Sequence, residues 1–185
     1  MKLNDKLEKR LKAIQQIAKS DGKVEDLFKL MRTHKDLWWL AYRQIYPNKG
    51  AMTKGTTADT LDGFSEERVE KLIELLSERN YHFQPARRVY IPKANGKKRA
   101  LGIACSDDKL VMTVCKILLE VIYEPIFSDH SHGFRKGRSC HSALEHIKYW
   151  NGCKWFCEFD ISSCFDAIDH IILIRLMEQR IKDAC

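Results

Sequence analysis

The segment from residue 87 to residue 103 constrains the fold most, because it has the pattern of two short strands around a tight reversal. Residues 89–91 are Val-Tyr-Ile, which favour an extended strand, and residues 101–103 can return beside them. Asn95-Gly96 between the two is a strong reversal signal, since both residue types tolerate left-handed backbone. The sequence therefore predicts an antiparallel hairpin at this point of the chain.

The length of the reversal decides which charged side chains share a face of this hairpin. A two-residue loop pairs Lys93 with Lys98 and, because side chains alternate along a strand, sends Arg99 to the opposite face from Lys93. A three-residue loop, with its glycine left-handed, pairs Lys93 with Lys97 and brings Arg99 onto their face. Only the second geometry forms a single clamp for a phosphate group, and the residue pattern alone leaves both open.

The hairpin is also strongly basic. No acidic residue interrupts its cations, which are Arg87, Arg88, Lys93, Lys97, Lys98 and Arg99. Mutual repulsion makes such a cluster costly unless an anion binds, and phosphate is the usual anion. The whole chain of 185 residues has 32 Lys and Arg against 25 Asp and Glu, a formal charge of +7, which fits a polyanionic partner without requiring one. A solvated surface turn is the alternative interpretation.

A second basic group is the loop at residues 133–139, which reads Gly-Phe-Arg-Lys-Gly-Arg-Ser. Glycines let a backbone approach phosphates closely, and an arginine fork can bind a phosphate through two parallel N–H groups. Phe134 could stack on a base or anchor the loop in the core, and we expect core anchoring. The loop is thus a second candidate for binding phosphates.

Apolar residues recur at helical spacing in several stretches, which predict a helix-rich chain. Helices are expected over residues 3–18, after a Ser65 cap, from Ser106 onward, after a Ser139 cap and after an Asp169 cap. The helix after Ser139 is expected to bury Ala143, Leu144, Ile147 and Trp150. The helix after Asp169 is expected to bury Ile172, Leu173 and Leu176. Residues 155–161 alternate instead, which predicts a strand with Cys157 inward. Helices and strands mix without strict alternation, so the expected fold class is α+β.

The predicted strand ends in Phe159-Asp160-Ile161. A carboxylate at the end of a hydrophobic strand is a standard way to hold a divalent cation on a rigid element. Glu158 would share a face with Asp160, so a two-carboxylate cation site is an alternative to a single ligand. Asp166 and Asp169 are expected to make local turn hydrogen bonds instead.

Binding of zinc through histidine and cysteine is a further alternative. One short region holds His130, His132, Cys140, His141, His146, Cys153 and Cys157. Their spacings fit no familiar paired-ligand zinc pattern. The seven cysteines of the chain are scattered without Cys-x-x-Cys spacing, as expected of packed thiols in a reducing compartment.

Neither a membrane span nor a signal peptide is predicted. The most apolar stretch, residues 110–127, is interrupted by Lys116, Glu120 and Glu124, and it could not cross a bilayer without burying these charges. The first ten residues alternate charges with leucines. We therefore expect an intracellular protein that does not enter the membrane.

Taken in order, these segments resemble the bacterial group II intron reverse transcriptases, also called intron maturases. The resemblance begins at residues 48–51 and the loop through 62–63, and includes Asp108-Lys109, Phe165-Asp166 and residues 168–170. Its longest motifs are RVYIPKANGKKRALGI at 88–103, YEPIF at 123–127, SHGFRKGRS at 131–139 and FDI at 159–161. It covers residues 38–185.

This resemblance implies a right-hand polymerase that copies RNA into DNA and assists the splicing of its own intron RNA. Residues 1–37 would be the variable helical lead of the family. Residues 38–150 would form the fingers with their N-terminal extension, and residues 151–185 the start of the palm. The implied partners are the intron RNA, an RNA template, a DNA primer and deoxynucleotides, and the implied location is the bacterial cytoplasm.

The resemblance also implies roles for individual residues. Lys93 and Arg99 would hold the triphosphate of the incoming nucleotide, which favours the three-residue loop. Asp160 would bind both catalytic Mg²⁺ ions, with the Ile161 carbonyl at one of them, and Phe165 would be the steric gate that excludes ribonucleotides. The side chains expected along the nucleic acid are Arg88, Lys97, Lys98, Arg135, Lys136 and Arg138. The basic hairpin and the acid are expected to form two walls of one nucleotide pocket.

One family motif is missing. The second metal-binding motif, Tyr-Ala-Asp-Asp, has no counterpart in the chain, and the tandem acids Asp107-Asp108 stand at a helix start, where capping explains them. Two-cation phosphoryl transfer needs carboxylates that fix both ions, so this fragment is expected to be inactive by itself. An RNA-binding splicing module without polymerase activity is the alternative function. Self-association is expected where a truncated palm exposes its surface.

Overall fold

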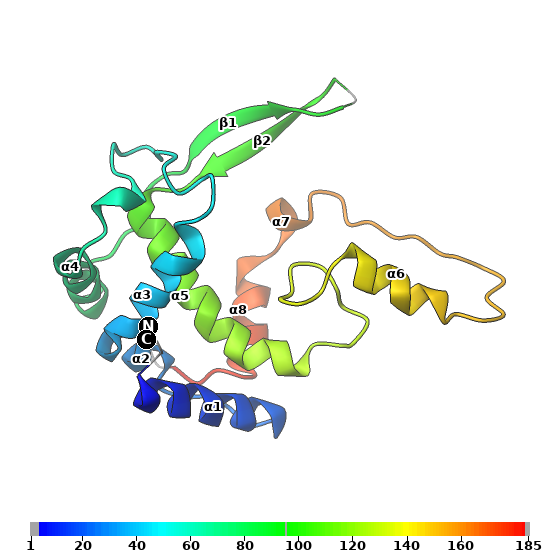
Figure 1. Cartoon of the computed structure of the whole chain (residues 1–185), viewed down its shortest axis with the longest axis horizontal. Coiled ribbons are helices and arrows are strands. Elements are labelled where there is room, and N and C mark those ends of the chain that lie inside the picture. The colour runs from blue at the N-terminus through cyan, green and yellow to red at the C-terminus, as the bar shows by residue number, and fades with distance from the viewer. Residues whose placement is uncertain (1–3, 95, 184–185) are drawn as a thin grey trace. The chain divides into compact units, whose positions relative to one another are not determined.

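A computed structural model of the chain describes residues 4–94 and 96–183. Leu3, in the first expected helix, and Asn95, in the expected reversal, lie outside the described residues. The described part is rich in helices and has one sheet, a two-stranded antiparallel hairpin (Figure 1). This confirms the predicted combination of helices with a basic hairpin.

The chain divides into two compact units. Among the described residues, the first unit comprises residues 4–11 and 26–120, and the second comprises residues 12–25 and 121–183. In chain order the elements are α1 (Asp5–Lys19), α2 (Leu27–Thr33), α3 (Lys35–Ile45), η1 (Leu61–Gly63), α4 (Glu66–Ser77), β1 (Arg87–Pro92), β2 (Lys98–Ile103), α5 (Ser106–Tyr123), η2 (Glu124–Ile126), α6 (Cys140–Lys148), α7 (Cys164–Ala167) and α8 (His170–Glu178).

The core of the first unit is built by the inward faces of its helices. The helix expected from Ser106 onward is α5, and its apolar stripe is buried. Trp38 of α3 is fully buried, and its indole N–H donates to the Met31 carbonyl at 2.9 Å. The buried side chains include Leu37, Trp38, Leu61, Val69, Leu72, Leu110 and Val114. In the described part of the chain, no helix combines the length and the apolar character needed to cross a bilayer.

The predicted helix caps are confirmed. The Ser65 hydroxyl accepts a hydrogen bond from the Arg68 N–H at 3.2 Å, and the Ser139 hydroxyl accepts one from the Ser142 N–H at 3.3 Å. The Asp169 carboxylate accepts hydrogen bonds from the N–H groups of Ile171 and Ile172, in the first turn of α8. Each cap satisfies backbone donors that have no partner within their own helix, which fixes where α4, α6 and α8 begin.

The tandem acids at the start of α5 do not act as caps, contrary to the prediction. Asp108 is buried and accepts hydrogen bonds from the Tyr81 hydroxyl at 2.6 Å and from the Gln84 N–H at 3.1 Å. Asp107 forms an ion pair with Arg68 at 2.6 Å. Both carboxylates therefore tie other segments of the first unit to α5.

The strand predicted over residues 155–161 is absent, which is a correction. The segment is extended but unpaired, and Trp155 and Phe159 are 85% and 91% exposed. A strand needs a neighbour for its N–H and C=O groups, and within residues 4–94 and 96–183 no segment pairs with this one. The alternating pattern is typical of a strand, but it does not say which segment would pair with it. Cys157, which was predicted to point inward, is exposed.

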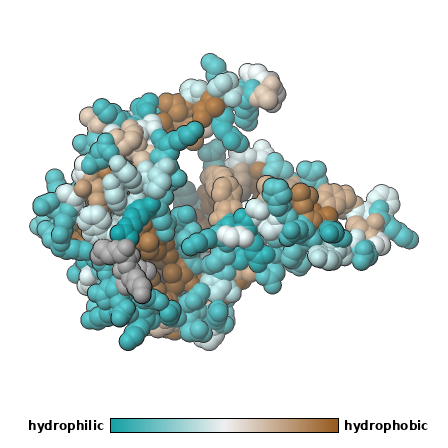
Figure 2. All heavy atoms as spheres, in the orientation of Figure 1, coloured by the Kyte–Doolittle hydropathy of each residue, from teal (hydrophilic) through white to brown (hydrophobic). Residues whose placement is uncertain are grey.

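The helices α6 and α8 form as predicted, but their apolar faces are not buried. Leu144 and Ile147 of α6 are exposed, as are Ile172, Leu173 and Leu176 of α8. Apolar side chains reach the surface of the molecule, where Figure 2 shows them in brown. Exposed apolar area of this kind is typical of a surface that another polypeptide covers.

Candidate functional site

The register of the hairpin settles the length of its loop. Pro92 pairs with Lys98, and beyond this pair the Lys93 N–H donates to the Lys97 carbonyl at 2.7 Å. Gly96 closes the turn by donating its N–H to the Lys93 carbonyl at 3.0 Å, with φ +77°. A side chain rarely adopts this left-handed backbone, which is why glycine is needed here. The loop therefore has three residues.

This register places Lys93, Lys97 and Arg99 on one face of the hairpin. Cross-strand partners point to the same side and successive residues to opposite sides, so Lys98 and Arg88 lie on the other face. The shared face of Lys93 and Arg99 was predicted from the three-residue loop and is confirmed. The side chains on both faces are exposed, namely Arg88, Lys93, Lys97, Lys98 and Arg99. An anion in solution can therefore reach the face that carries Lys93 and Arg99.

Arg87 has a different role from the other cations of the hairpin. Its guanidinium donates to the Lys54 carbonyl at 2.9 and 3.0 Å and to the Gly55 carbonyl at 3.1 Å. These bonds fix the base of the hairpin to the preceding loop. The sequence pattern could not separate this anchoring arginine from its neighbours, because nothing in the spacing marks the carbonyls that it reaches.

Lys109 holds the same loop from α5. Its ammonium group donates to the carbonyls of Gly50 at 3.0 Å and Thr53 at 2.7 Å. Burial lowers the pKa of Lys109, since desolvation disfavours the charged form. The Asp108-Lys109 motif thus organises the first unit through both of its side chains, a role that the sequence analysis did not identify.

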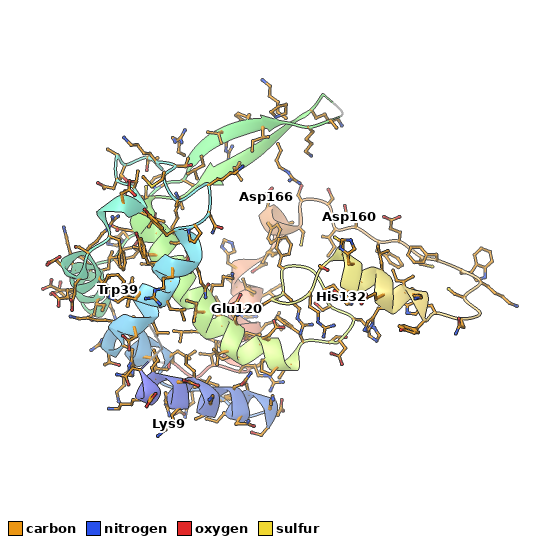
Figure 3. The ribbon with its side chains drawn as sticks, viewed as in Figure 1. Lys9, Trp39, Glu120, His132, Asp160 and Asp166 are labelled. Carbon is orange, nitrogen blue, oxygen red and sulfur yellow. The ribbon has the colours of Figure 1, made fainter. Side chains whose placement is uncertain are left out.

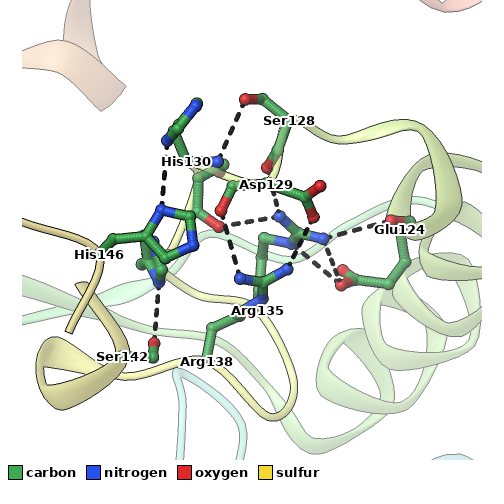
Figure 4. A network of polar contacts seen from close by, with 10 residues as sticks. Glu124, Ser128, Asp129, His130, Arg135, Arg138, Ser142 and His146 are labelled. Carbon is green, nitrogen blue, oxygen red and sulfur yellow. Dashed lines mark hydrogen bonds and ion pairs between the residues drawn. The ribbon is translucent and has the colours of Figure 1, made fainter. Parts of the chain in front are cut away.

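In the second unit, Arg135 is the centre of the polar network in Figure 4. Its side chain is only 7% exposed, and its Nε and Nη2 contact the Glu124 carboxylate at 3.0 and 2.9 Å. Its Nη1 donates to the carbonyls of Ser128 and Ser131, each at 2.8 Å. Every nitrogen of this guanidinium contacts an oxygen of the chain itself, and Arg135 thereby stabilises the loop.

The other two cations of the loop are more accessible. Arg138 pairs with Asp129 at 3.1 Å, and the Asp129 side chain is largely exposed. Lys136 is exposed beside Gly137, which has φ +73°. Lys136 therefore keeps the accessibility that binding of nucleic acid would need, whereas Arg138 is 26% exposed and also donates to the Asp129 carbonyl at 3.2 Å.

Phe134 does not anchor the loop in the core, which corrects the prediction. Its ring is 98% exposed, and its backbone has φ +58°. The interior position next to it is taken by Arg135, so the phenylalanine points to solvent. Its ring lies edge-on to that of Phe165, which is also exposed, with ring centroids 6.4 Å apart.

Asp160 lies on the exposed extended segment between α6 and α7 (Figure 3). Glu158 and Ile161 are exposed on the same segment, and Asp166 lies in α7. Among the described residues no group of three or more His, Cys, Asp or Glu side chains could hold a metal ion. The residues present thus offer one aspartate for a divalent cation but not the complete carboxylate set that two ions require.

The histidines considered for zinc gather in the second unit. His130 and His146 approach through their Nδ1 atoms at 3.3 Å, and the His132 Nδ1 lies 2.8 Å from the Ser142 hydroxyl. Burial, and then the positive charge of Arg138, lower the pKa of His132. The rings thus contact one another and the α6 cap region.

Comparison with known proteins assigns the family. Residues 91–184 match the family model described as reverse transcriptase (RNA-dependent DNA polymerase). The group II intron-encoded protein LtrA of Lactococcus lactis subsp. cremoris is 53% identical over 150 residues, which are 80% of this chain and 25% of the relative. A 91 kDa protein in the cob intron of Schizosaccharomyces pombe is 46% identical over 159 residues, 85% of this chain and 20% of that protein.

A further relative is the putative COX1/OXI3 intron 1 protein of Saccharomyces cerevisiae, which is 39% identical over 149 residues, 80% of this chain and 18% of the relative. The chain thus spans a quarter or less of the length of these curated relatives. The names of these three relatives all refer to an intron. Because the family model matches residues 91–184, the chain belongs to the reverse transcriptase (RNA-dependent DNA polymerase) family.

Proposed function

We propose that this chain is the nucleotide- and strand-holding part of a group II intron-encoded RNA-directed DNA polymerase. The observation that carries the proposal is the three-residue hairpin loop, which gathers Lys93, Lys97 and Arg99 on one exposed face. In this assignment residues 1–37 are the helical lead, 38–150 the fingers and 151–185 the start of the palm. The family match and the intron-encoded relatives support the proposal that the chain is part of such a polymerase.

In the proposed enzyme, Lys93 and Arg99 bind the triphosphate of the incoming deoxynucleotide. A lysine supplies a compact point charge, and an arginine supplies a planar fork that suits phosphate oxygens. The face contains no acidic residue that would compete for these cations. Phe165, whose ring is exposed, is proposed as the gate that discriminates against the ribose 2′-hydroxyl.

Asp160 is proposed as a ligand of the catalytic Mg²⁺, with the Ile161 carbonyl beside it. Magnesium prefers carboxylate and carbonyl oxygens, and both groups are accessible on their segment. One aspartate cannot fix two cations, so the remaining ligands would have to come from outside the described residues. The 185-residue chain alone is therefore expected to lack polymerase activity.

A second candidate function is an RNA-binding splicing module in the bacterial cytoplasm. The accessible Lys136 favours it, because an exposed cation supports binding of phosphates without needing a metal site. Intron RNA is the proposed partner, in keeping with the intron-encoded relatives. The exposed apolar faces of α6 and α8 favour self-association of the chain as well.

The clamp predicts a difference between the two faces of the hairpin. Lys93→Ala and Arg99→Ala should each weaken binding of a fluorescently labelled deoxynucleoside triphosphate by about tenfold, the size expected for one charge-assisted contact. Lys98→Ala is the matched control, because it removes the same charge from the opposite face. Equal losses for all three variants, measured by fluorescence anisotropy, would show that only net charge matters and would refute the clamp.

Binding of RNA should weaken steeply as salt concentration rises. For a single strand, each lost phosphate contact makes the negative slope of log affinity against log salt shallower by about 0.7, and we expect this change in Lys97→Ala and in Arg138→Ala. Titrations of labelled RNA at several salt concentrations give the slopes. Affinity that is indifferent to salt would count against both candidate functions.

A further inference from the structure

The second face of the hairpin carries a feature that the nucleotide clamp does not use. We propose that this face, formed by Arg88, Tyr90 and Lys98 with the small residues Ala100 and Gly102, binds an unpaired base of a single-stranded nucleic acid. Tyr90 would stack on the base, and the two cations would contact its neighbouring phosphates. The proposal rests on the proposed function, since it extends the nucleic-acid contact of the same hairpin.

The register places these residues together. Arg88 pairs with Gly102, Tyr90 with Ala100, and Pro92 with Lys98, so all of them lie on the face opposite Lys93 and Arg99. Arg88 and Tyr90 are two residues apart, about 6.6 Å along a strand. The aromatic ring therefore has a cation on its own strand and another diagonally across the hairpin.

The ring is open to solvent on this face. Tyr90 is 60% exposed, and Arg88 and Lys98 are exposed as well. Its cross-strand partner is Ala100, whose methyl group is too small to cover an aromatic face. The structure gives Arg88, Tyr90 and Lys98 no ion pair or hydrogen bond of their side chains within the described part of the chain, so all three can bind another molecule.

The chemistry of the face favours a nucleic acid over a protein. An exposed aromatic flanked by cations is typical of sites where bases stack and phosphates pair with lysine or arginine. The face has no acidic residue, and the exposed aliphatic side chains Ile91 and Leu101 lie on the opposite face. Stacking needs a base that is not already paired, which makes single strands the expected ligand and duplexes poor ones.

The test uses the whole chain and a short labelled RNA without self-complementarity. We expect Tyr90→Ala to weaken binding of this RNA by about tenfold, within the range for one stacked base, while the salt slope stays unchanged. Tyr90→Trp should retain the affinity, because it keeps an aromatic face. Phe83→Ala is the matched control, since Phe83 is an equally exposed aromatic residue of the same unit outside the hairpin.

Two further ligands separate the outcomes. Single-stranded DNA of the same sequence should show the same loss in Tyr90→Ala, and duplex RNA should show little. Three results would overturn the stacking site. They are an equal loss of affinity for duplex and single strand in Tyr90→Ala, a loss in Tyr90→Ala no larger than that in Phe83→Ala, and a failure of Tyr90→Trp to retain binding. Salt-dependent binding whose affinity is unchanged in Tyr90→Ala overturns only this inference, whereas the absence of salt-dependent binding contradicts the proposed function.

Discussion

Arg135→Ala should destabilise the second unit by about 3 kcal/mol, because it removes a nearly buried guanidinium on which a carboxylate and two carbonyls depend. The Glu124 carboxylate loses its ion pair, and the carbonyls of Ser128 and Ser131 lose their donor. Arg135→Lys should recover little of this loss, since an ammonium group cannot reach the carboxylate and both carbonyls with a fixed fork. Urea unfolding followed by circular dichroism measures the free energy of unfolding.

Lys136→Ala is the matched control, because Lys136 is the next residue and is exposed. Exposed substitutions of this kind usually change stability by less than about 0.5 kcal/mol. If Arg135→Ala were as mild as Lys136→Ala, the loop would not depend on the network in Figure 4. Direct contact of Arg135 with nucleic acid would then become the better account of this residue.

Asp108→Ala should destabilise the first unit by about 2 to 4 kcal/mol, because it leaves two hydrogen-bond donors without their acceptor in a buried position. The Gln84 N–H and the Tyr81 hydroxyl both donate to this carboxylate. Burial, together with the hydrogen bond to Asp108, raises the pKa of the Tyr81 phenol, so the hydroxyl keeps its proton at neutral pH and continues to donate. Chemical unfolding of the variant gives the loss.

Two comparisons make this prediction specific. Tyr81→Phe removes one of the two donors and should cost about 1 kcal/mol. Asp59→Ala removes an exposed aspartate of the same unit and should leave stability nearly unchanged, within about 0.5 kcal/mol. A loss in Asp108→Ala as small as that in Asp59→Ala would contradict the bridging role of the buried carboxylate.

Local features of the fold could be predicted from the sequence wherever neighbouring residues determine them. The caps at Ser65, Ser139 and Asp169 are confirmed because a capping side chain bonds to N–H groups within a few residues of itself. The three-residue turn was one of two open alternatives, and the hydrogen bonds around Gly96 decide between them. The shared face of Lys93 and Arg99 then follows from strand geometry alone.

Features that depend on distant partners could not be predicted. Residues 155–161 have strand periodicity, but the part of the chain that the structure describes offers them no neighbouring strand, and apolar side chains of α6 and α8 are exposed. Asp108 was assigned to capping because its bonds to Tyr81 and Gln84 cross between segments. Arg135 was grouped with the phosphate-binding cations, because only the folded loop shows that its acceptors lie within the chain.

We propose that this chain supplies a working part of an RNA-directed DNA polymerase. The most direct measurement is RNA-templated primer extension by a chimera in which the matching 150 residues of Lactococcus lactis LtrA are replaced by those of this chain, with unmodified LtrA measured alongside. We predict a DNA product from the chimera and none from the 185-residue chain alone.

Asp160→Asn in the chimera should lower the rate on the order of a thousandfold, because the amide no longer supplies a charged ligand to a metal ion. Glu158→Gln is the matched control on the same segment and should leave synthesis nearly unchanged. Synthesis by the Asp160→Asn chimera at the rate of the unsubstituted chimera, or a product from the isolated chain that Asp160→Asn abolishes, would contradict the account.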